Sequence, residues 1–177
     1  MVKNHFDGRT MHIDVSKRFY QIGDSGIAFK IILTNEHKGM AISNKLKRGL
    51  RKNLHIDKDY TKLYSICIYY LIENNLDSFD NLVICNDEIY KDTKKYLDLL
   101  FQGDGKYSSK FITSLSELRK ITGDSKIRSY ADHIANIYRK KALKHLRRKQ
   151  KGIPLNIVEI SYQKIKDKWE EINKKVK

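Results

Sequence analysis

The chain has 177 residues, and 40% of them are hydrophobic, which is too many for a disordered chain. No apolar run approaches the roughly 18 residues that a transmembrane helix needs, so we expect no membrane association. Lys and Arg total 36 against 21 Asp and Glu, which leaves a net charge of +15. This excess predicts a polyanionic partner, DNA or RNA, unless the host's proteins are lysine-rich in general.

The length predicts a single domain over residues 1–177, with 155–177 as a C-terminal strand–helix extension of it. Residues 1–12 contain no apolar stretch of the kind found in secretory signals, which predicts a cytoplasmic location. Cys67 and Cys85 each lie inside an apolar run. We expect both to be reduced core residues, because free cysteines are commonly buried.

The N-terminal third predicts a β-hairpin, because two β-rich runs, 11–22 and 26–35, flank the turn-forming residues 23–26. Residues 40–54 carry apolar side chains every four positions, which predicts a short basic helix or a partly ordered loop. The run 59–76 is apolar on most faces and long. It therefore predicts a buried helix, although its centre alone fits a strand.

Residues further along the chain predict alternating strands and helices. The apolar run 82–85 predicts a buried central strand that ends in acids. Expected next are an amphipathic helix over 89–102, a strand over 110–115, helix signals at 116–126, a long helix over 125–150, a strand over 155–162 and a terminal helix over 163–177. This alternation predicts an α/β or α+β layered fold.

Two basic segments are candidates for contacts with nucleic-acid phosphates. Cations at a helix C-terminus also interact favourably with the helix dipole, but this explains one or two residues and not eight between 139 and 151. Phosphate contacts give salt-dependent affinity and little sequence specificity. The candidates are Lys45, Lys47, Arg48, Arg51 and Lys52 in the first segment and Arg139, Lys140, Lys144, Arg147 and Arg148 in the second.

The 11 tyrosines offer rings on which unpaired bases could stack. Tyr64, Tyr69 and Tyr70 lie in an apolar run and fit core packing better. Tyr107, in a glycine-containing segment, is expected to be more exposed.

Three acids occupy positions where a metal site could form. Asp14 lies in the first strand, and its neighbours Ile13 and Val15 are expected to point to the opposite face of the sheet. Asp87 follows the buried strand at its carboxyl end, where open α/β sheets usually hold their sites. Asp132 lies near the start of the long helix. Carboxylate oxygens are the ligands that Mg²⁺ prefers.

This constellation resembles the ribonuclease H-like superfamily of nucleases, resolvases and transposases. In that superfamily an Asp on the first strand, an Asp at the end of the fourth strand and an acid on a late helix hold two metal ions. The run 130–138 (YADHIANIY) is similar to the late helix of Holliday-junction resolvases and related nucleases. The resemblance, over residues 11–146, implies a mixed sheet flanked by helices and a two-metal site. It further implies catalytic, metal-binding residues Asp14, Asp87 and Asp132, with Mg²⁺ or Mn²⁺ as cofactor.

The chain departs from the superfamily pattern in two respects. The helix before the fourth strand offers no acid before Glu73, so Glu36, Glu73 or Glu88 would have to substitute. Glu88 is the best placed of these, because it adjoins Asp87. Only two clear strands precede the first basic segment, whereas the superfamily begins with a meander of three.

Other catalytic signatures are absent from the sequence, which contains no GxxxxGK[ST], GxGxxG or GxSxG motif. The six histidines form no HxH or HExxH pair. His12 and His133 lie close to proposed acids, which suits the positioning of a water or phosphate as well as an ordinary surface role.

Each acid also has a simpler structural interpretation. Asp14 fits a surface position on a strand, Asp87 a turn or helix N-cap, and Asp132 a solvent-facing acid paired with a lysine. The sequence therefore leaves open a protein-interaction module of a lysine-rich host and, beside it, two functions that involve nucleic acid. One is a metal-dependent nuclease or resolvase that cleaves phosphodiester bonds. The other is a non-enzymatic nucleic-acid-binding protein, regulatory or packaging, from a virus, plasmid or archaeon.

Overall fold

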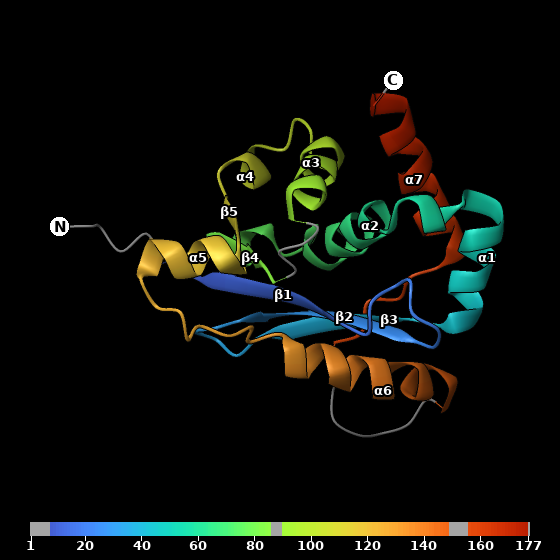
Figure 1. Cartoon of the computed structure of the whole chain (residues 1–177), viewed down its shortest axis with the longest axis horizontal. Helices are drawn as coiled ribbons and strands as arrows, with labels where there is room; N and C mark the ends of the chain where they lie inside the picture. Colours follow the sequence, from blue (N-terminus) through green and yellow to red (C-terminus); the bar gives the residue numbers. More distant parts are fainter. Residues whose placement is uncertain (1–7, 86–89, 149–155, 177) are drawn as a thin grey trace.

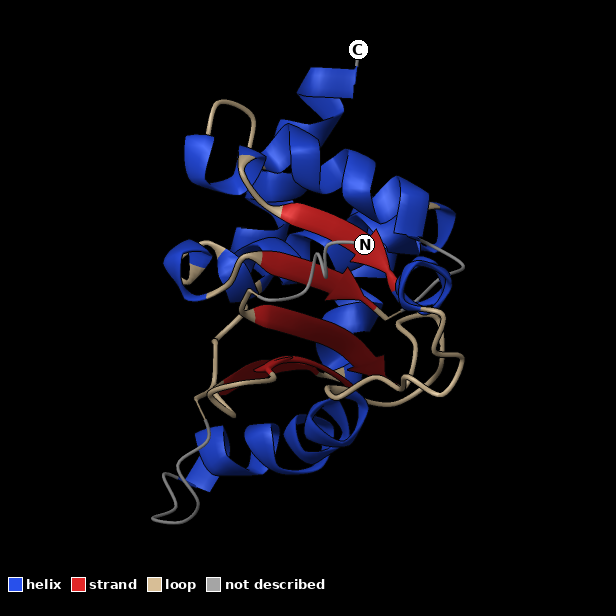
Figure 2. Cartoon of the chain, turned by 90° about the vertical axis from the view of Figure 1, so that its left-hand side faces the viewer, coloured by secondary structure: helices blue, strands red, loops and turns tan. Residues whose placement is uncertain are grey.

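A five-stranded mixed sheet with helices on both of its faces forms the centre of the fold (Figures 1 and 2). The computed structural model describes residues 8–85, 90–148 and 156–176, with the backbone alone for 145–148. The strand order is β3-β2-β1-β4-β5. The strands are β1 (Thr10–Ser16), β2 (Ser25–Ile31), β3 (His37–Ile42), β4 (Asn81–Ile84) and β5 (Phe111–Ser114). The predicted mixed α/β class is confirmed.

The helices follow the predicted amphipathic segments, apart from two late starts and a short helix at Gly105–Ser108 that was not predicted. The helix or loop predicted over 40–54 is a helix from Asn44 onward, because residues 40–42 belong to β3. The predicted helix over 125–150 begins only at Asp132. None of the helices in the described part of the chain is both long and apolar enough to span a membrane. The helices are α1 (Asn44–Leu54), α2 (Tyr60–Ile72), α3 (Tyr90–Leu100), α4 (Gly105–Ser108), α5 (Leu115–Thr122), α6 (Asp132–Arg148) and α7 (Tyr162–Val176), with short 3₁₀ turns at Ile56–Lys58 and Leu76–Ser78.

The N-terminal strands form an antiparallel meander of three, one strand more than the sequence predicted. The hairpin of β1 and β2 is confirmed, but β1 ends at Ser16, and residues 17–24 form a loop that buries Phe19. The unpredicted strand is β3, which pairs antiparallel with β2. Its sequence, HKGMAI, shows no clear alternation of apolar and polar residues, because one of its faces carries Gly39 and Ala41 in place of larger apolar residues.

β4 and β5 extend the sheet on the other side of β1, and both run parallel to it. The strand predicted over 155–162 does not form among residues 156–162. Ile157 makes a single parallel bridge to Gly39 at the sheet edge, and the helix α7 begins soon afterwards. Ile165, Trp169 and Ile172 of α7 are buried in the main core cluster, as their spacing predicted.

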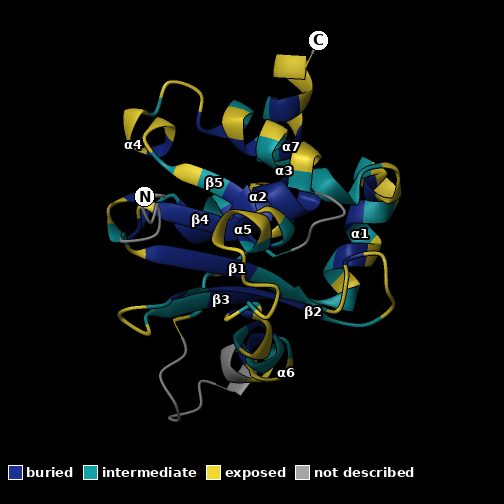
Figure 3. Cartoon of the chain, turned by 60° about the vertical axis from the view of Figure 1, so that its left-hand side comes forward, coloured by how far each residue is buried: buried dark blue, intermediate teal, exposed yellow. Residues whose placement is uncertain are grey.

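The two faces of the sheet are covered differently (Figures 1 and 3). The face with Ile13, Phe29 and Ile84 packs against α2 and α3, and α7 packs on α1, α2 and α3 to complete the main core. We call this face the core face. The opposite face is covered by α6 over β1–β3 and by α5 over β4 and β5, and we call it the α6 face. Cys67 is buried in the main core, whereas Cys85 is only half-buried and lies on the α6 face.

α6 lies unusually close to the sheet because the contact is made by small residues. Ala28 and Ala41 of the strands meet Ala135 and Ala142 of the helix. At Gly26 a side-chain carbon would collide with the backbone of α6 at Ala135, so only glycine fits there. The first turns of α6 are thereby held close to β1 and β2.

Candidate functional site

Asp14 lies near the C-terminal end of the central strand β1, on the α6 face. The strand alternation turns Ile13 and Val15 to the core face, as the sequence predicted. The pKa of Asp14 is raised to about 6, chiefly by burial and to a smaller extent by the negative charge of Asp132, while hydrogen bonds from Ser129 and from the Val15 N–H (2.7 Å) act in the opposite direction. An ionised Asp14 is therefore costly, which is typical of a carboxylate in a functional site.

Asp132 is the first residue of α6, and its side chain is exposed. The close approach of α6 to the sheet brings this residue near enough to Asp14 for its charge to affect the Asp14 carboxyl. An acid in the first turn of a helix also interacts favourably with the helix dipole. Two of the three predicted acids are thus brought to the same end of β1.

The third predicted acid, Asp87, and the neighbouring Glu88 lie outside the described residues. The strand that leads to them ends beside Asp14, because the N–H of Cys85 donates to the carbonyl of Ile13 at 2.9 Å. Asp87 follows two residues later in the sequence. Among residues 8–85, 90–148 and 156–176, no group of three or more His, Cys, Asp or Glu side chains is arranged to hold a metal ion.

His12 precedes Asp14 by two residues and lies on the same face of β1. It is buried, so the ordinary surface role does not apply, and burial lowers its pKa to about 4. Its Nδ1 lies 3.7 Å from the sulfur of Cys85, and its ring meets the ring of Tyr130 edge-on at 5.2 Å between centroids. The imidazole is therefore neutral at pH 7. His133, by contrast, is exposed.

Tyr64 is a further residue near this site, and sequence patterns placed it only in the core. Its side chain reaches from α2 toward the strand end, and the charge of Asp14 adds to the effect of burial in raising the pKa of its hydroxyl. Within the described part of the chain, this buried hydroxyl has no hydrogen-bond partner. Few buried polar groups in native proteins lack a hydrogen-bond partner, and the hydroxyl of Thr93 is a second example among the residues that the structure describes.

Two of the basic residues predicted on α1 anchor the loop 17–24. Lys47 is fully buried, and its Nζ donates to the carbonyl of Gln21 (2.8 Å) and to Oγ of Ser25 (2.9 Å). Arg51 is half-buried and donates to the carbonyl of Tyr20 at 3.0 Å. The prediction that Lys47 contacts phosphate is therefore wrong, because the helix turns it inward on the same side as Leu50.

The other described basic candidates lie at or near the surface. Arg139 is half-buried and donates to Oγ of Ser16 (3.2 Å) and Oδ1 of Asn136 (2.8 Å). The side chains of Arg147 and Arg148 lie outside the described residues. The candidates that are exposed are Lys45, Arg48, Lys52, Lys140 and Lys144.

The loop 17–24 follows the end of β1 and packs against the basic helix α1. It is held to α1 through Lys47 and Arg51, and Ser16, immediately before it, is bonded to Arg139 of α6. The loop adds exposed Lys17 and Arg18 of its own. Cations from α1, the loop and α6 therefore lie around the end of the strand that carries Asp14.

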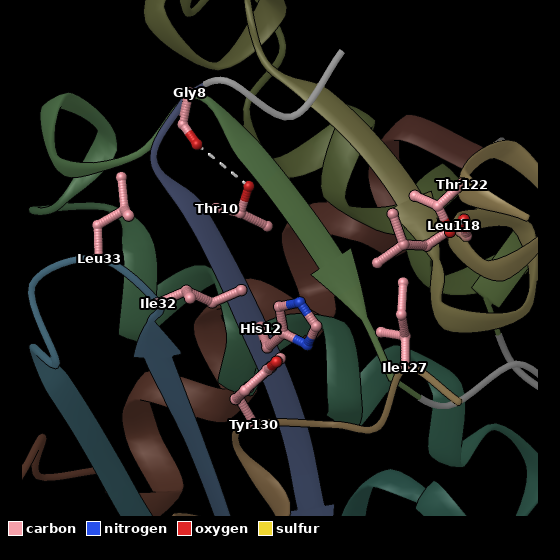
Figure 4. A pocket seen from close by; sticks show the side chains of 9 residues that line it. All are labelled: Gly8, Thr10, His12, Ile32, Leu33, Leu118, Thr122, Ile127 and Tyr130. Atoms are coloured by element: carbon pink, nitrogen blue, oxygen red, sulfur yellow. Dashed lines mark hydrogen bonds between the residues drawn. The ribbon is translucent and has the colours of Figure 1, made fainter. Parts of the chain in front are cut away.

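A cavity of about 450 Å³ lies on the α6 face, between α5 and the segment that leads into α6 (Figure 4). Thr10 and His12 of β1 line it from the sheet, and the ring of Tyr130 lines it from the segment before α6. Its remaining lining residues are Gly8, Ile32, Leu33, Leu118, Thr122 and Ile127. Tyr107, which was expected to be more exposed, is buried in the main core and does not line this cavity.

The comparisons with known proteins give no match: no family model, no curated protein and no solved structure is similar enough to this chain to be identified. The function is therefore argued from the geometry and chemistry of the chain itself.

Proposed function

We propose that this chain is a nucleic-acid-binding protein and a Mg²⁺- or Mn²⁺-dependent nuclease or resolvase of the ribonuclease H-like type. The observation that carries the proposal is the position of Asp14. Its carboxyl is half-buried at the end of the central strand, with a raised pKa, and α6 begins near it with a second acid, Asp132. Carboxylates converging from a first strand and a late helix match the superfamily that the sequence resembles.

The strand arrangement also supports this assignment. The resemblance implies an initial meander of three strands. The third of these is β3, which pairs antiparallel with β2 and was not predicted from the sequence. It further requires the fourth strand to end near the acid of the first strand. β4 pairs parallel with β1 and ends beside Ile13, immediately before Asp14.

The side chains at this position fit a hard divalent cation. Asp14 and Asp132 offer carboxylate oxygens, and Asp87 and Glu88, in the segment after β4, would be the further ligands. A divalent cation would offset both the burial of the Asp14 charge and its repulsion by Asp132. Such a cation activates water and neutralises charge that develops on a phosphate during hydrolysis.

The exposed cations support binding of a polyanion at the same end of the sheet. Lys45, Arg48 and Lys52 of α1 and Lys140 and Lys144 of α6 are available to phosphates. Lys17 and Arg18, which are also exposed, directly follow the end of β1. A binding mode of this kind predicts affinity that decreases steeply with salt concentration.

The test is a cleavage assay with labelled single-stranded, duplex and branched DNA and RNA in Mg²⁺, Mn²⁺ or EDTA. We expect metal-dependent cleavage that decreases at least about a hundredfold in Asp14→Asn and in Asp87→Asn, because each change removes a charged metal ligand. Asp57→Asn is the matched control, since Asp57 is exposed in a 3₁₀ turn away from β1. Cleavage that persists in EDTA or in Asp14→Asn would refute the metal mechanism.

A second candidate function is a non-enzymatic nucleic-acid-binding protein with a regulatory or packaging role. It is favoured by the net charge of +15 and by the exposed cations of α1 and α6, which need no metal site to bind a polyanion. This function predicts salt-sensitive binding with no cleavage in any metal. It also predicts that Asp14→Asn leaves the affinity unchanged or raises it, since the change removes a negative charge near the phosphates.

A further inference from the structure

We propose that the cavity beside Asp14 binds an unpaired nucleobase of the strand whose phosphate lies at the acids. The inference deepens the proposed function and rests on it. It assigns a substrate class, namely DNA or RNA with a bulged, mismatched or otherwise unpaired base, in preference to a fully paired duplex.

The chemistry of the lining suits a flat, uncharged ring. Ile32, Leu118 and Ile127 provide apolar walls, and the ring of Tyr130 forms part of the opening (Figure 4). None of the nine lining residues carries a carboxylate, ammonium or guanidinium group, so the cavity is not a phosphate site. Its volume of about 450 Å³ falls within the range of roughly 300–1,000 Å³ for small-molecule pockets.

Polar groups are present where a base could form hydrogen bonds. The hydroxyls of Thr10 and Thr122 and the imidazole of His12 line the cavity. The Thr10 hydroxyl donates to the carbonyl of Gly8 and accepts from Nδ2 of Asn81, both at 3.3 Å, which leaves one oxygen lone pair to accept from a ligand. Ligand pockets commonly combine apolar walls with a few such groups.

The position of the cavity connects it to the acids. Thr10, His12 and Asp14 follow one another on the same face of β1, and alternate residues of a strand are about 7 Å apart. A base in the cavity and a phosphate at Asp14 can therefore belong to one nucleotide or to two adjacent ones. The segment before α6 also joins the cavity to Asp14, because Ser129 forms a hydrogen bond with Asp14 and the next residue, Tyr130, lines the cavity.

The cavity also leaves apolar surface exposed. The side chain of Tyr130 is 51% exposed and that of Leu33 is 70% exposed at the opening. Stacking of a base on an aromatic side chain contributes about 1–3 kcal/mol, and a base that is already unpaired costs least to withdraw from a helix. These two effects favour strands with unpaired bases over paired duplex.

The experiment compares the dissociation constants of two fluorescein-labelled duplexes, identical except for a single-base bulge in one. Both are measured in EDTA at one low salt concentration, so that no metal-dependent cleavage interferes. We expect the wild-type chain to bind the bulged duplex at least about tenfold more tightly. Tyr130→Ala, which removes the stacking ring, and Thr122→Phe, which fills the cavity, are both expected to abolish most of this preference.

Two matched variants serve as controls. Phe111→Ala removes an aromatic side chain that is 42% exposed and does not line the cavity. Ile121→Phe adds a ring next to Thr122 on α5 at a residue that also does not line it. Both are expected to keep the wild-type preference for the bulge, and circular dichroism verifies that every variant is folded.

The outcomes separate the two proposals. Equal affinity of the wild-type chain for the two duplexes, or a preference unaffected by Tyr130→Ala and Thr122→Phe, would overturn the base site and leave the proposed function in place. A chain that binds neither duplex at low salt would overturn the proposed function, and the base site with it.

Discussion

The two faces of the sheet differ in what they bury, and the proposed function lies on one of them. The core face carries large apolar side chains such as Ile13 and Phe29, which are fully buried in the main core. The α6 face carries alanines and glycines under α6, and along β1 it carries the polar residues His12 and Asp14 and one wall of a cavity. Burial of ionisable side chains lowers the free energy of unfolding, and such a loss of stability is common at functional sites.

The core face is expected to give the largest loss of stability. Leu71 of α2 is fully buried in the main core, so Leu71→Ala should decrease the free energy of unfolding by about 2–5 kcal/mol. Urea denaturation measures the loss, and nucleic-acid affinity per folded molecule should stay unchanged. A loss of less than about 1 kcal/mol would mean that the core face is not the main source of stability.

The α6 face is expected to be sensitive to the addition of a single carbon. Gly26→Ala should decrease the free energy of unfolding by about 1–3 kcal/mol, because the methyl group collides with the backbone of α6. The variant should also lose activity, since α6 carries Asp132.

Gly49→Ala provides the control for Gly26→Ala. Gly49 lies within α1 with no atom near its position for a side chain, so alanine should raise the free energy of unfolding by up to about 1 kcal/mol. If both alanine variants behave alike in thermal denaturation, close packing of α6 is not what positions Asp132.

The burial of Asp14 predicts a stability effect that depends on pH. The folded chain binds the Asp14 proton more tightly than the unfolded chain does, because the pKa of about 6 lies above the ordinary value of 3.8. Ionisation of Asp14 therefore lowers stability as the pH rises from about 4 to about 6, and the loss persists above that range.

Asp14→Asn removes this loss. In EDTA we expect the variant and the wild type to be equally stable at about pH 4, and the variant to be more stable by about 1–3 kcal/mol at pH 7. Added Mg²⁺ should stabilise the wild type and have little effect on the variant. If Asp14→Asn is more stable than the wild type by the same amount at every pH, packing and not ionisation is the cause of the difference.

The smallest effect is expected on the outer surface of α1, away from the sheet. Arg48→Ala should weaken nucleic-acid binding a few-fold and decrease the slope of log affinity against log salt by about one, since one phosphate contact is lost. Lys47→Met is the comparison, because Lys47 is buried. It should leave the salt slope unchanged, and an equal decrease in both variants would place Lys47 at the interface.

The sequence by itself determined the elements whose side chains alternate or repeat clearly. The amphipathic spacing of α1, α3 and α7 and the apolar run of β4 predicted these elements within a few residues. Asp14 was correctly assigned to the face of β1 opposite Ile13, since the alternation of a strand is a local property. The net charge of +15 likewise needs no structure.

The tertiary structure decided which of these residues meet. β3 was not predicted, because Gly39 and Ala41 are too small to show the apolar alternation of a strand. Their small size is required by the close packing of α6, which lies far along the sequence. Lys47 carries a charge, yet it is buried by the loop that it anchors. The nearness of Asp132 to Asp14 and the cavity beside them depend on how closely α5 and α6 pack on the sheet. Local patterns encode each element and its faces, whereas distances between elements are set by side-chain packing across the whole fold.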